Sequence, residues 1–356
     1  MQIEHQSERA TLAPRSSELA GKDALDPKSL IPVVAGYRNP SLVRSLFELI
    51  VTLGPLVLLW AAMLASLQVG YWLTLLLAIP AAFFVVRVFL IQHDCGHGAF
   101  FRRHAMNNWV GRALGVLTLT PYDVWRRAHA LHHATTGNLD RRGIGDIETI
   151  TVREYRARPW SGRLAYRLYR NPIVLFGIGP AYQFFLKHRL PFGMMREGWR
   201  PWISSLATNA AIAVAVAGMM MLVGVVPFLL IQLPIMALAA SIGVWLFYVQ
   251  HQFEHTIWAN NEEWDLLEAA FYGSSHYVLP GILRWFTANI GAHHIHHLCS
   301  RIPFYRLPHV LQDRPELARV GRITLMESFR NVRLTLWCET QQQLISFRQL
   351  RNSPAA

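Results

Sequence analysis

The sequence predicts an all-α integral membrane protein with four transmembrane helices in two hairpins and a cytoplasmic helical cap. Composition is the first observation: of the 356 residues, 52% are hydrophobic and only 16% are charged. Soluble domains carry about 25% charged residues. The second observation is that the apolar residues are concentrated in two long spans. The third is that the 34 Lys and Arg residues lie almost entirely outside those spans.

The first apolar span runs from Leu46 to Ile91, where the only charged residues are Glu48 and Arg87. The second begins at Pro201, and no Lys or Arg follows until after Leu283. The apolar stretch of each is about twice the roughly 20 residues that one crossing helix needs, and a short turn interrupts each. Helices of these lengths disfavour the alternative, a large soluble helical protein. We therefore expect transmembrane helices near 46–67, 71–91, 203–223 and 226–249.

Basic residues predict the orientation. Six of the 34 Lys and Arg precede the first span, 17 lie between 102 and 200, and ten follow Leu283. Because both hairpins return to the side they left, these segments share one face, and the positive-inside rule makes that face cytoplasmic. The predicted order is a cytoplasmic N-terminal tail (1–45), hairpin 1 (46–91), a cap segment (92–202), hairpin 2 (203–249) and a second cap segment with the C-terminal tail (250–356).

Two further segments carry expectations. Residues 171–186 are apolar but short and interrupted by Pro and Gly, so we expect an interfacial or re-entrant segment. The stretch 317–337 is expected to form a cytoplasmic helix that packs on the cap or binds headgroups, with packing the favoured role. Despite the formal charge of +12, no basic stripe interleaved with stacking aromatics appears, so nucleic-acid binding is not expected.

The histidines form four short motifs on the predicted cytoplasmic face: HDCGH (93–97), HALHH (129–133), HQFEH (251–255) and HHIHH (293–297). His129, His132 and His133 stand at positions i, i+3 and i+4, and the last motif repeats this spacing. On a helix these positions share one face, so we expect the three imidazoles of each triplet to converge on one point. His294 is rotated by about 100° and is expected to point elsewhere.

This pattern predicts a histidine-box site for two metals in the cap. Imidazole suits iron, copper, zinc and nickel, whereas hard cations prefer oxygen ligands. Eight or nine histidines exceed what one ion takes, and two ions with four or five ligands each fit the count. The chemistry favours iron, because two irons would form a redox site that activates O₂. The spacing alone leaves copper and zinc open.

The segments HDCGH, HALHHATTGNLDRRGIGD, LFYVQHQFEH and NIGAHHIHHLCSRIPFYRLP together resemble the membrane fatty-acid desaturases. The likeness extends from about residue 35 to 325 and is strongest to bacterial and cyanobacterial acyl-lipid enzymes of the Δ12 and Δ5 types. It implies a four-helix anchor, a cytoplasmic cap and two iron ions. O₂ and two electrons would then remove two vicinal hydrogens from an acyl chain, leaving a cis double bond and water.

Carried over by position, the resemblance implies nine metal ligands: His93, His97, His129, His132, His133, His251, His293, His296 and His297. His255 has no counterpart in the family pattern, so ligation, outer-sphere and surface roles stay open for it. Asn289 precedes His293 by four residues and could hold a metal-bound water or cap a helix. Carboxylates near the motifs are expected to orient the ligating imidazoles; they are Asp94, Asp140, Asp146 and Glu254.

The resemblance also implies partners and a location. We expect an acyl-lipid substrate in the bilayer and an external electron donor, ferredoxin or cytochrome b5, with its reductase. The expected location is a bacterial inner membrane, with both termini and the active site on the cytoplasmic face. The alternative is a related membrane hydroxylase or oxygenase acting on fatty acids, alkanes or carotenoids. A metal transporter or sensor is disfavoured because the predicted helices are almost free of the polar ligands that transporters place at the midplane.

Overall fold

The computed structural model describes residues 25–143 and 145–352, and residues 1–24 of the expected N-terminal tail lie outside this range. It confirms a mostly helical chain with four helices long and apolar enough to cross a membrane. These helices are α3 (Leu42–Ser66), α4 (Tyr71–Gly96), α10 (Trp199–Val223) and α11 (Val225–His251). Each has at least 25 residues, which corresponds to about 37 Å of helix against a hydrocarbon core of about 30 Å.

Local sequence explains where these helices begin and end. The Ser41 hydroxyl accepts a hydrogen bond from the Arg44 amide and caps the start of α3. Gly224 separates α10 from α11 with a φ of 91°, a left-handed conformation that glycine adopts without steric cost. The predicted hairpins are therefore present, and their helices extend a few residues beyond the predicted bounds, chiefly at the ends that lead to the cap.

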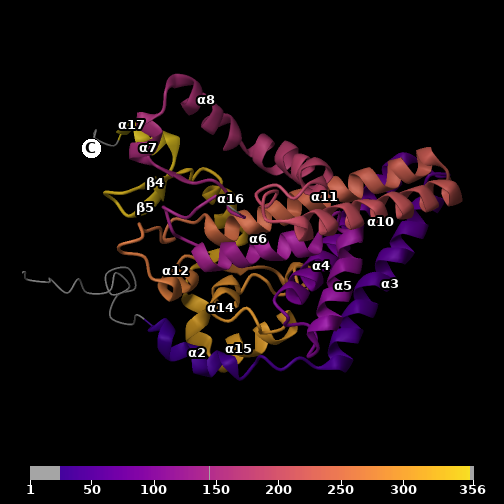
Figure 1. Cartoon of the computed structure of the whole chain (residues 1–356), viewed down its shortest axis with the longest axis horizontal. Coiled ribbons are helices and arrows are strands. Elements are labelled where there is room, and N and C mark those ends of the chain that lie inside the picture. Colours follow the sequence, from indigo (N-terminus) through magenta and orange to yellow (C-terminus); the bar gives the residue numbers. More distant parts are fainter. Residues whose placement is uncertain (1–24, 144, 353–356) are drawn as a thin grey trace, which may run out of the picture.

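The helices of each hairpin differ in burial. In the most apolar window of α4, 61% of the residues are buried inside the protein, against none in the corresponding window of α10. Helix α4 packs against both α3 and α11, whereas α10 leaves residues such as Val214 and Met221 exposed. Figure 1 shows the four helices extending from the cap toward the same end of the molecule. Helices α4 and α11 are therefore the inner pair, and both end in histidine motifs.

The two charged residues of hairpin 1 pair with each other inside the protein. Arg87 of α4 forms an ion pair with Glu48 of α3, and both side chains are 1% exposed. Arg87 also donates to the Thr52 hydroxyl at 3.1 Å and to the Trp285 carbonyl oxygen. Arg44 contacts the same carboxylate at 2.7 Å. Because a buried charge is tolerated when it is paired and hydrogen-bonded, these residues are compatible with a membrane-embedded hairpin.

Short elements make up the cap. Before hairpin 2 they are α2 (Pro27–Ala35), α5 (His104–Leu117), α6 (Tyr122–Thr135), α7 (Val152–Ala157), α8 (Trp160–Tyr169), η2 (Val174–Ile178), α9 (Gly179–Ala181), η3 (Tyr182–Leu186) and η4 (Lys187–Arg189). After it they are α12 (Leu266–Tyr272), α13 (Gly281–Phe286), α14 (His293–Leu298), η5 (Phe304–Arg306), α15 (Leu307–Asp313), η6 (Pro315–Arg319), α16 (Leu325–Asn331) and α17 (Phe347–Asn352).

Two small sheets join distant parts of the cap, in addition to the expected helices. Strands β1 (Ile150–Thr151), β4 (Leu336–Cys338) and β5 (Gln343–Ile345) form one sheet in the order β1-β4-β5. Strands β2 (His276–Val278) and β3 (Arg322–Thr324) pair in parallel in the other, with Tyr277 opposite Ile323. Figure 1 shows β4, β5, α7 and α17 grouped at the end of the molecule away from α10.

The expected helix at 317–337 is wrong. This stretch instead contains the end of η6, strand β3, the short helix α16 and strand β4. Gly321 interrupts it with a φ of +55°, and a Cβ there would lie 2.9 Å from the Ser274 carbonyl oxygen. The close approach of two backbones, which only glycine permits, brings β3 beside β2 and prevents one continuous helix.

Residues 171–186 form two π-helical turns, η2 and η3, on either side of α9. This segment packs along α11, with Phe176 against Trp245 and Tyr248 at ring-centroid distances of 5.1 and 5.2 Å. It does not form a fifth long apolar helix among the described residues. It therefore lies beside the cap end of α11, and its place relative to the membrane stays a prediction.

Candidate metal centre

Four helices bring the histidine motifs together. HDCGH lies at the end of α4, HALHH in α6, the start of HQFEH at the end of α11, and HHIHH at the start of α14. The second motif follows α5, which packs against both α4 and α6. Helix α14 packs beside α12 and β2. Segments that are 200 residues apart in the sequence therefore end at one place beneath the inner transmembrane helices.

The first cluster contains five histidines: His93, His97, His129, His133 and His296. One ring nitrogen from each lies within 4.8 Å of the others. His93 and His296 are buried, whereas His97, His129 and His133 are partly exposed. We call this the open cluster.

The second cluster contains four histidines: His132, His251, His293 and His297. Their ring nitrogens also lie within 4.8 Å of one another, and all four side chains are buried. We call this the closed cluster. The two are adjacent, since the rings of His133 and His297 stack across their boundary with centroids 4.0 Å apart.

Each HxxHH triplet divides between the clusters, which corrects the expectation that its three imidazoles converge on one point. In α6, His129 and His133 enter the open cluster and His132 enters the closed one. In α14 the assignment is the opposite: His293 and His297 belong to the closed cluster, and His296 belongs to the open one. Residues four apart lie nearly above one another on a helix, whereas position i+3 is offset around it. The motif therefore supplies two histidines to one cluster and one to its neighbour.

The ring nitrogens are arranged as ligands of a shared cation. Nε2 of His129 lies 3.0 Å from Nε2 of His97, and Nε2 of His251 lies 3.1 and 3.0 Å from those of His132 and His293. Two ligands at right angles, each about 2.0–2.1 Å from one ion, would be about 2.9 Å apart. In addition, both ring nitrogens of the buried His297 have no hydrogen-bond partner among the described residues. These nitrogens need a metal or water as partner, so the donor set fits a metal in each cluster.

Burial keeps these imidazoles neutral. Desolvation, followed by the neighbouring histidines, holds the pKa values of His129 and His133 well below the usual value of 6.5. The same causes lower the pKa values of His293 and His297 in the closed cluster. A neutral imidazole offers the lone pair that a metal requires, whereas imidazolium does not.

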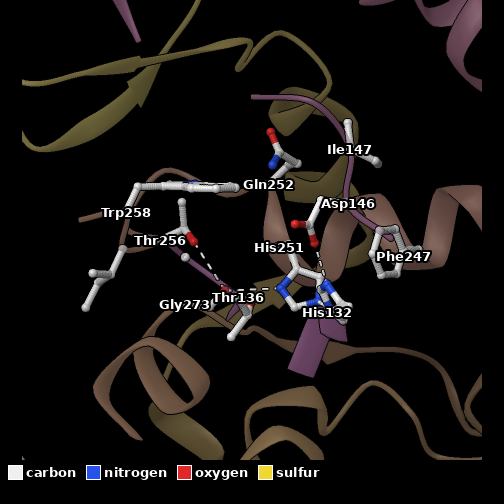
Figure 2. A pocket seen from close by; sticks show the side chains of 12 residues that line it. His132, Thr136, Asp146, Ile147, Phe247, His251, Gln252, Thr256, Trp258 and Gly273 are labelled. Atoms are coloured by element: carbon white, nitrogen blue, oxygen red, sulfur yellow. Dashed lines mark hydrogen bonds and ion pairs between the residues drawn. The ribbon is translucent and has the colours of Figure 1, made fainter. Parts of the chain in front are cut away.

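Outer groups orient the closed cluster (Figure 2). Asp146 Oδ1 lies 2.5 Å from Nδ1 of His132, and the Gly273 carbonyl oxygen lies 3.4 Å from Nδ1 of His251. Each contact places the ring proton on Nδ1 and directs Nε2 into the cluster. In the open cluster, Asp94 Oδ1 lies 3.7 Å from Nδ1 of His93. Asp94 also accepts a hydrogen bond from the Phe304 amide at 2.7 Å.

The other two expected carboxylates serve elsewhere. Asp140 accepts a hydrogen bond from the Asn261 amide at 2.7 Å and so joins two loops. Glu254 is exposed. Neither has a hydrogen bond or ion pair with a cluster histidine.

Three residues discussed from the sequence lie outside both clusters. His294 points away, as expected, with Nε2 2.9 Å from the Leu317 carbonyl oxygen. His255 is exposed. The side-chain amide of Asn289 donates to the Phe304 carbonyl oxygen at 3.3 Å, and the residue adopts a φ of +55°.

A pocket borders the closed cluster at His132 and His251 (Figure 2). Its remaining lining comes from Thr136, Gly137, Asp146, Ile147, Phe247, Gln252, Thr256, Ile257, Trp258 and Gly273. The indole N–H of Trp258 is buried and has no hydrogen-bond partner among the described residues. The side chain of Gln252 exchanges hydrogen bonds with Thr149 and accepts one from Arg170 at 3.0 Å.

Sequence reasoning missed two contacts of the site. The Gly273 carbonyl has no sequence signal, because a backbone oxygen can belong to any residue. The stacking of Trp125 on His129, with centroids 4.8 Å apart at 14°, depends on Gly96, where a Cβ would lie 2.8 Å from the indole. The glycine within HDCGH was the available signal.

Comparisons with known proteins show sequence similarity to one family. Residues 69–326 match the family model of fatty acid desaturases. The chain is 43% identical to a fatty acid desaturase of Bacillus subtilis over 92% of this chain and 93% of that protein. It is 28% identical to an sn-1 acyl-lipid omega-3 desaturase (ferredoxin) of Synechocystis, covering 76% of this chain and 74% of the other. An acyl-lipid omega-3 desaturase (cytochrome b5) of Arabidopsis thaliana is also 28% identical, over 62% of this chain and 58% of the other.

Proposed function

The chain belongs to the fatty acid desaturase family, and we propose that it desaturates lipid-linked acyl chains with O₂ at a di-iron site held by nine histidines. Fatty acyl desaturation follows from the family, and the names of its relatives do not favour the hydroxylase or oxygenase alternative. The observation that carries the proposed site is the gathering of nine ring nitrogens into two adjacent clusters.

The proposed ligands of one iron are the open cluster, and those of the other are the closed cluster. Iron suits an all-imidazole donor set, and the family reaction needs a redox metal, which zinc is not. When bound, the two irons would supply the redox chemistry that reduces O₂ and removes hydrogen from unactivated methylenes. The balance is one acyl CH₂–CH₂ unit, O₂, two electrons and two protons in, and one CH=CH unit and two waters out.

The chain's own residues position this chemistry. Asp146 and the Gly273 carbonyl fix the tautomers of His132 and His251, so that both Nε2 lone pairs face the closed cluster. Trp125 covers one face of His129 and also contacts Phe89 of α4, with centroids 5.3 Å apart. These contacts hold the imidazoles in place and exclude water from one side of the open cluster.

A lipid-linked substrate is supported by the membrane association that the four apolar helices indicate. The relatives from Synechocystis and Arabidopsis are named as acyl-lipid desaturases. Their names also include ferredoxin and cytochrome b5, respectively. We propose a separate one-electron donor of this kind, with ferredoxin favoured for a chain this similar to a bacterial protein.

The proposed orientation places the cap, the clusters and both termini in the cytoplasm of a bacterium. Its support is the charge asymmetry: the segment 102–200 contains 17 Lys and Arg residues, whereas the turns of both hairpins contain none. The positive-inside rule then makes the cap face cytoplasmic. This proposal includes the segment bounds predicted from the sequence, which are 1–45, 46–91, 92–202, 203–249 and 250–356.

A fatty-acid profile tests the reaction. The chain would be expressed with ferredoxin and its reductase in a host of simple lipid composition, and new double bonds would be located by mass spectrometry. We expect a new unsaturated acyl species in the lipid fraction, and its loss in a His251→Ala variant, which removes one of the four histidines of the closed cluster. The matched control is His255→Ala, because His255 is exposed and outside both clusters.

Metal analysis of the purified protein tests the site independently. We expect about two equivalents of iron in the unmodified chain and fewer in His251→Ala. Hydroxylated acyl chains in place of unsaturated ones would overturn the proposed reaction. Zinc or copper as the bound metal in an active preparation would overturn the di-iron assignment alone.

A further inference from the structure

Helix α8 has an apolar face that points away from the protein. Trp160, Leu164 and Leu168 are 72%, 42% and 55% exposed, whereas Tyr166 on the same helix is 2% exposed. The three exposed residues are four apart, so they form one stripe along the helix. At about 100° per residue, this stripe lies opposite Tyr166. The outward side of α8 therefore carries an apolar stripe.

The buried face of α8 is firmly attached to the cap. The Tyr166 hydroxyl donates to the Thr335 carbonyl oxygen at 2.6 Å. At the end of the helix, the buried Arg170 donates to the Gln252 side chain at 3.0 Å and to the Leu334 carbonyl oxygen at 2.8 Å. These contacts fix the orientation of α8 on the cap. The stripe of Trp160, Leu164 and Leu168 therefore faces away from the cap.

The chain after α8 continues this apolar surface toward the transmembrane helices. Residues 171–186 contain no charged residue, and their exposed apolar side chains recur every four or five positions. These are Ile173, Ile178, Tyr182 and Leu186. Figure 1 shows α8 and this segment following one edge of the molecule from the β4–β5 sheet to the cap end of α11. Phe184 also reaches Phe89 near the cap end of α4, with centroids 6.3 Å apart.

The surroundings of the stripe are basic. Between 153 and 170 there are six arginines and one acid, Glu154, which gives a net charge of +5. Arg163 is exposed beside the stripe. Arg167, one turn further, is exposed and donates from Nε to the Tyr155 hydroxyl at 2.6 Å. A basic flank beside a Trp- and Leu-bearing face is the composition of helices that lie in the headgroup region of anionic membranes.

We propose that α8 lies in the membrane–water interface, with Trp160, Leu164 and Leu168 inserted among the acyl chains of an anionic leaflet and Arg163 and Arg167 at its phosphates. The continuous apolar surface through 171–186 places this contact at the level where α4 and α11 leave the membrane. The inference rests on membrane insertion of the four long helices and does not depend on desaturation.

This contact bears on the closed cluster. Arg170, the residue directly after α8, binds the side chain of Gln252, which is the neighbour of His251. A short series of bonded residues thus joins the lipid-facing helix to a cluster histidine. The position of α8 on the leaflet therefore helps to hold the end of α11 in place.

Depth-dependent quenching tests the proposal on the full chain in vesicles of phosphatidylcholine and phosphatidylglycerol. An environment-sensitive fluorophore would be attached to Leu164→Cys and, as a control, to Gln341→Cys in the exposed turn between β4 and β5. The native cysteines Cys95, Cys299 and Cys338 are buried, and the unsubstituted protein provides the labelling blank. We expect nitroxide-bearing lipids to quench the probe at 164 at least about threefold more strongly than the probe at 341, and aqueous iodide to show the reverse order.

Two results would overturn the proposal. Equal quenching of both probes by iodide would place α8 in water. Protection of the probe at 164 from both quenchers would mean that protein covers the stripe, such as a second copy of the chain. Because neither readout uses catalysis, failure here is distinguishable from failure of the proposed function.

The lipid charge gives a second measurement on the same probe. We expect lipid quenching at position 164 to weaken when phosphatidylglycerol is omitted, and to weaken similarly in Arg163→Glu with anionic lipid present. Lipid quenching that is unchanged in both cases would show that headgroup charge has no part in the contact.

Discussion

The open and closed clusters share two cap helices, α6 and α14, yet they differ in number of histidines, exposure and support. The open cluster has five histidines, three of them partly exposed, and the closed cluster has four, all buried. In the closed cluster, Asp146 and the Gly273 carbonyl bind the outer nitrogens of two imidazoles. In the open cluster the nearest such group is Asp94, 3.7 Å from His93.

This difference indicates a division of tasks. Under the proposed ligand assignment, the closed cluster has no ligand to spare and depends on outer groups for its geometry. The open cluster has one more imidazole, and three of its histidines are partly exposed. The split HxxHH motifs couple the two, since moving α6 or α14 displaces ligands of both clusters. Each prediction below removes one of these differences.

The largest expected effect is the loss of a ligand from the closed cluster. His251→Ala leaves three imidazoles and an unfilled position at the end of α11. We expect desaturation to fall at least about a hundredfold and bound metal to fall from about two equivalents to about one. Product formation and metal content would be measured on the same purified protein.

The comparison with the open cluster sharpens this prediction. His97→Ala leaves four imidazoles there, as many as the intact closed cluster has. We expect a loss nearer tenfold, with most of the metal retained. Equal losses of metal in the two variants would show that the fifth histidine is not a reserve and that the clusters are equivalent.

The second prediction concerns outer-sphere support. Asp146→Asn keeps the size of the side chain but removes the carboxylate that accepts from Nδ1 of His132. We expect a loss of about 10–100-fold in metal affinity or activity, as for other partners of metal-bound imidazoles. The matched control is Asp140→Asn, six residues away, whose carboxylate joins two loops instead. A similar loss in both variants would assign the Asp146 effect to cap folding.

The third prediction is a pH dependence of the protein stripped of metal. Burial lowers the pKa of His297 well below 6.5, so the folded state binds fewer protons than the unfolded state below that pH. The contribution of this histidine to the free energy of unfolding is therefore fully present above about pH 6.5 and is lost progressively on acidification. Each such histidine contributes about 1.4 kcal/mol per pH unit. Thermal unfolding of chelated protein between pH 7.5 and 5.5 would measure it.

A substitution of His297 tests whether the closed cluster causes this decrease of stability with acidification. In His297→Gln we expect a shallower decrease of stability with acidification, because one buried base is gone. His255→Gln changes an exposed histidine outside both clusters, and its slope should match that of the parent. An unchanged slope in His297→Gln would exclude this residue as a source of the acid sensitivity.

The overall architecture was predictable because hydropathy and charge are summed over local segments of the sequence and need no knowledge of tertiary contacts. The two apolar spans, together with the turns without Lys or Arg between their helices, were sufficient to locate all four long helices. The tail at 317–337 was not predictable in this way, because its structure depends on a distant partner. Gly321 approaches the Ser274 backbone and brings β3 beside β2, and no local pattern in 317–337 reveals that pairing.

The histidines of the site were predictable by number, but their arrangement was not. Spacing indicated that His129, His132 and His133 face one side of a helix, and they do. Which of them enters which cluster depends on where α4, α11 and α14 lie around α6, and that information is tertiary. The Gly273 carbonyl at His251 likewise depends on how α12 ends, which places a backbone oxygen with no side-chain signature.

The smallest expected effect concerns the covered face of the open cluster. Trp125 stacks on His129 and contacts Phe89 edge-on. Its indole makes no ring contact with a histidine of the closed cluster. Trp125→Leu keeps an apolar side chain while removing the flat surface that orients His129, so we expect a loss of only a few fold. Trp109→Leu, at a 70% exposed position on α5, is the control. If Trp125→Leu instead abolished activity with loss of metal, the open cluster would be as intolerant as the closed one, and the contrast between them would be one of exposure alone.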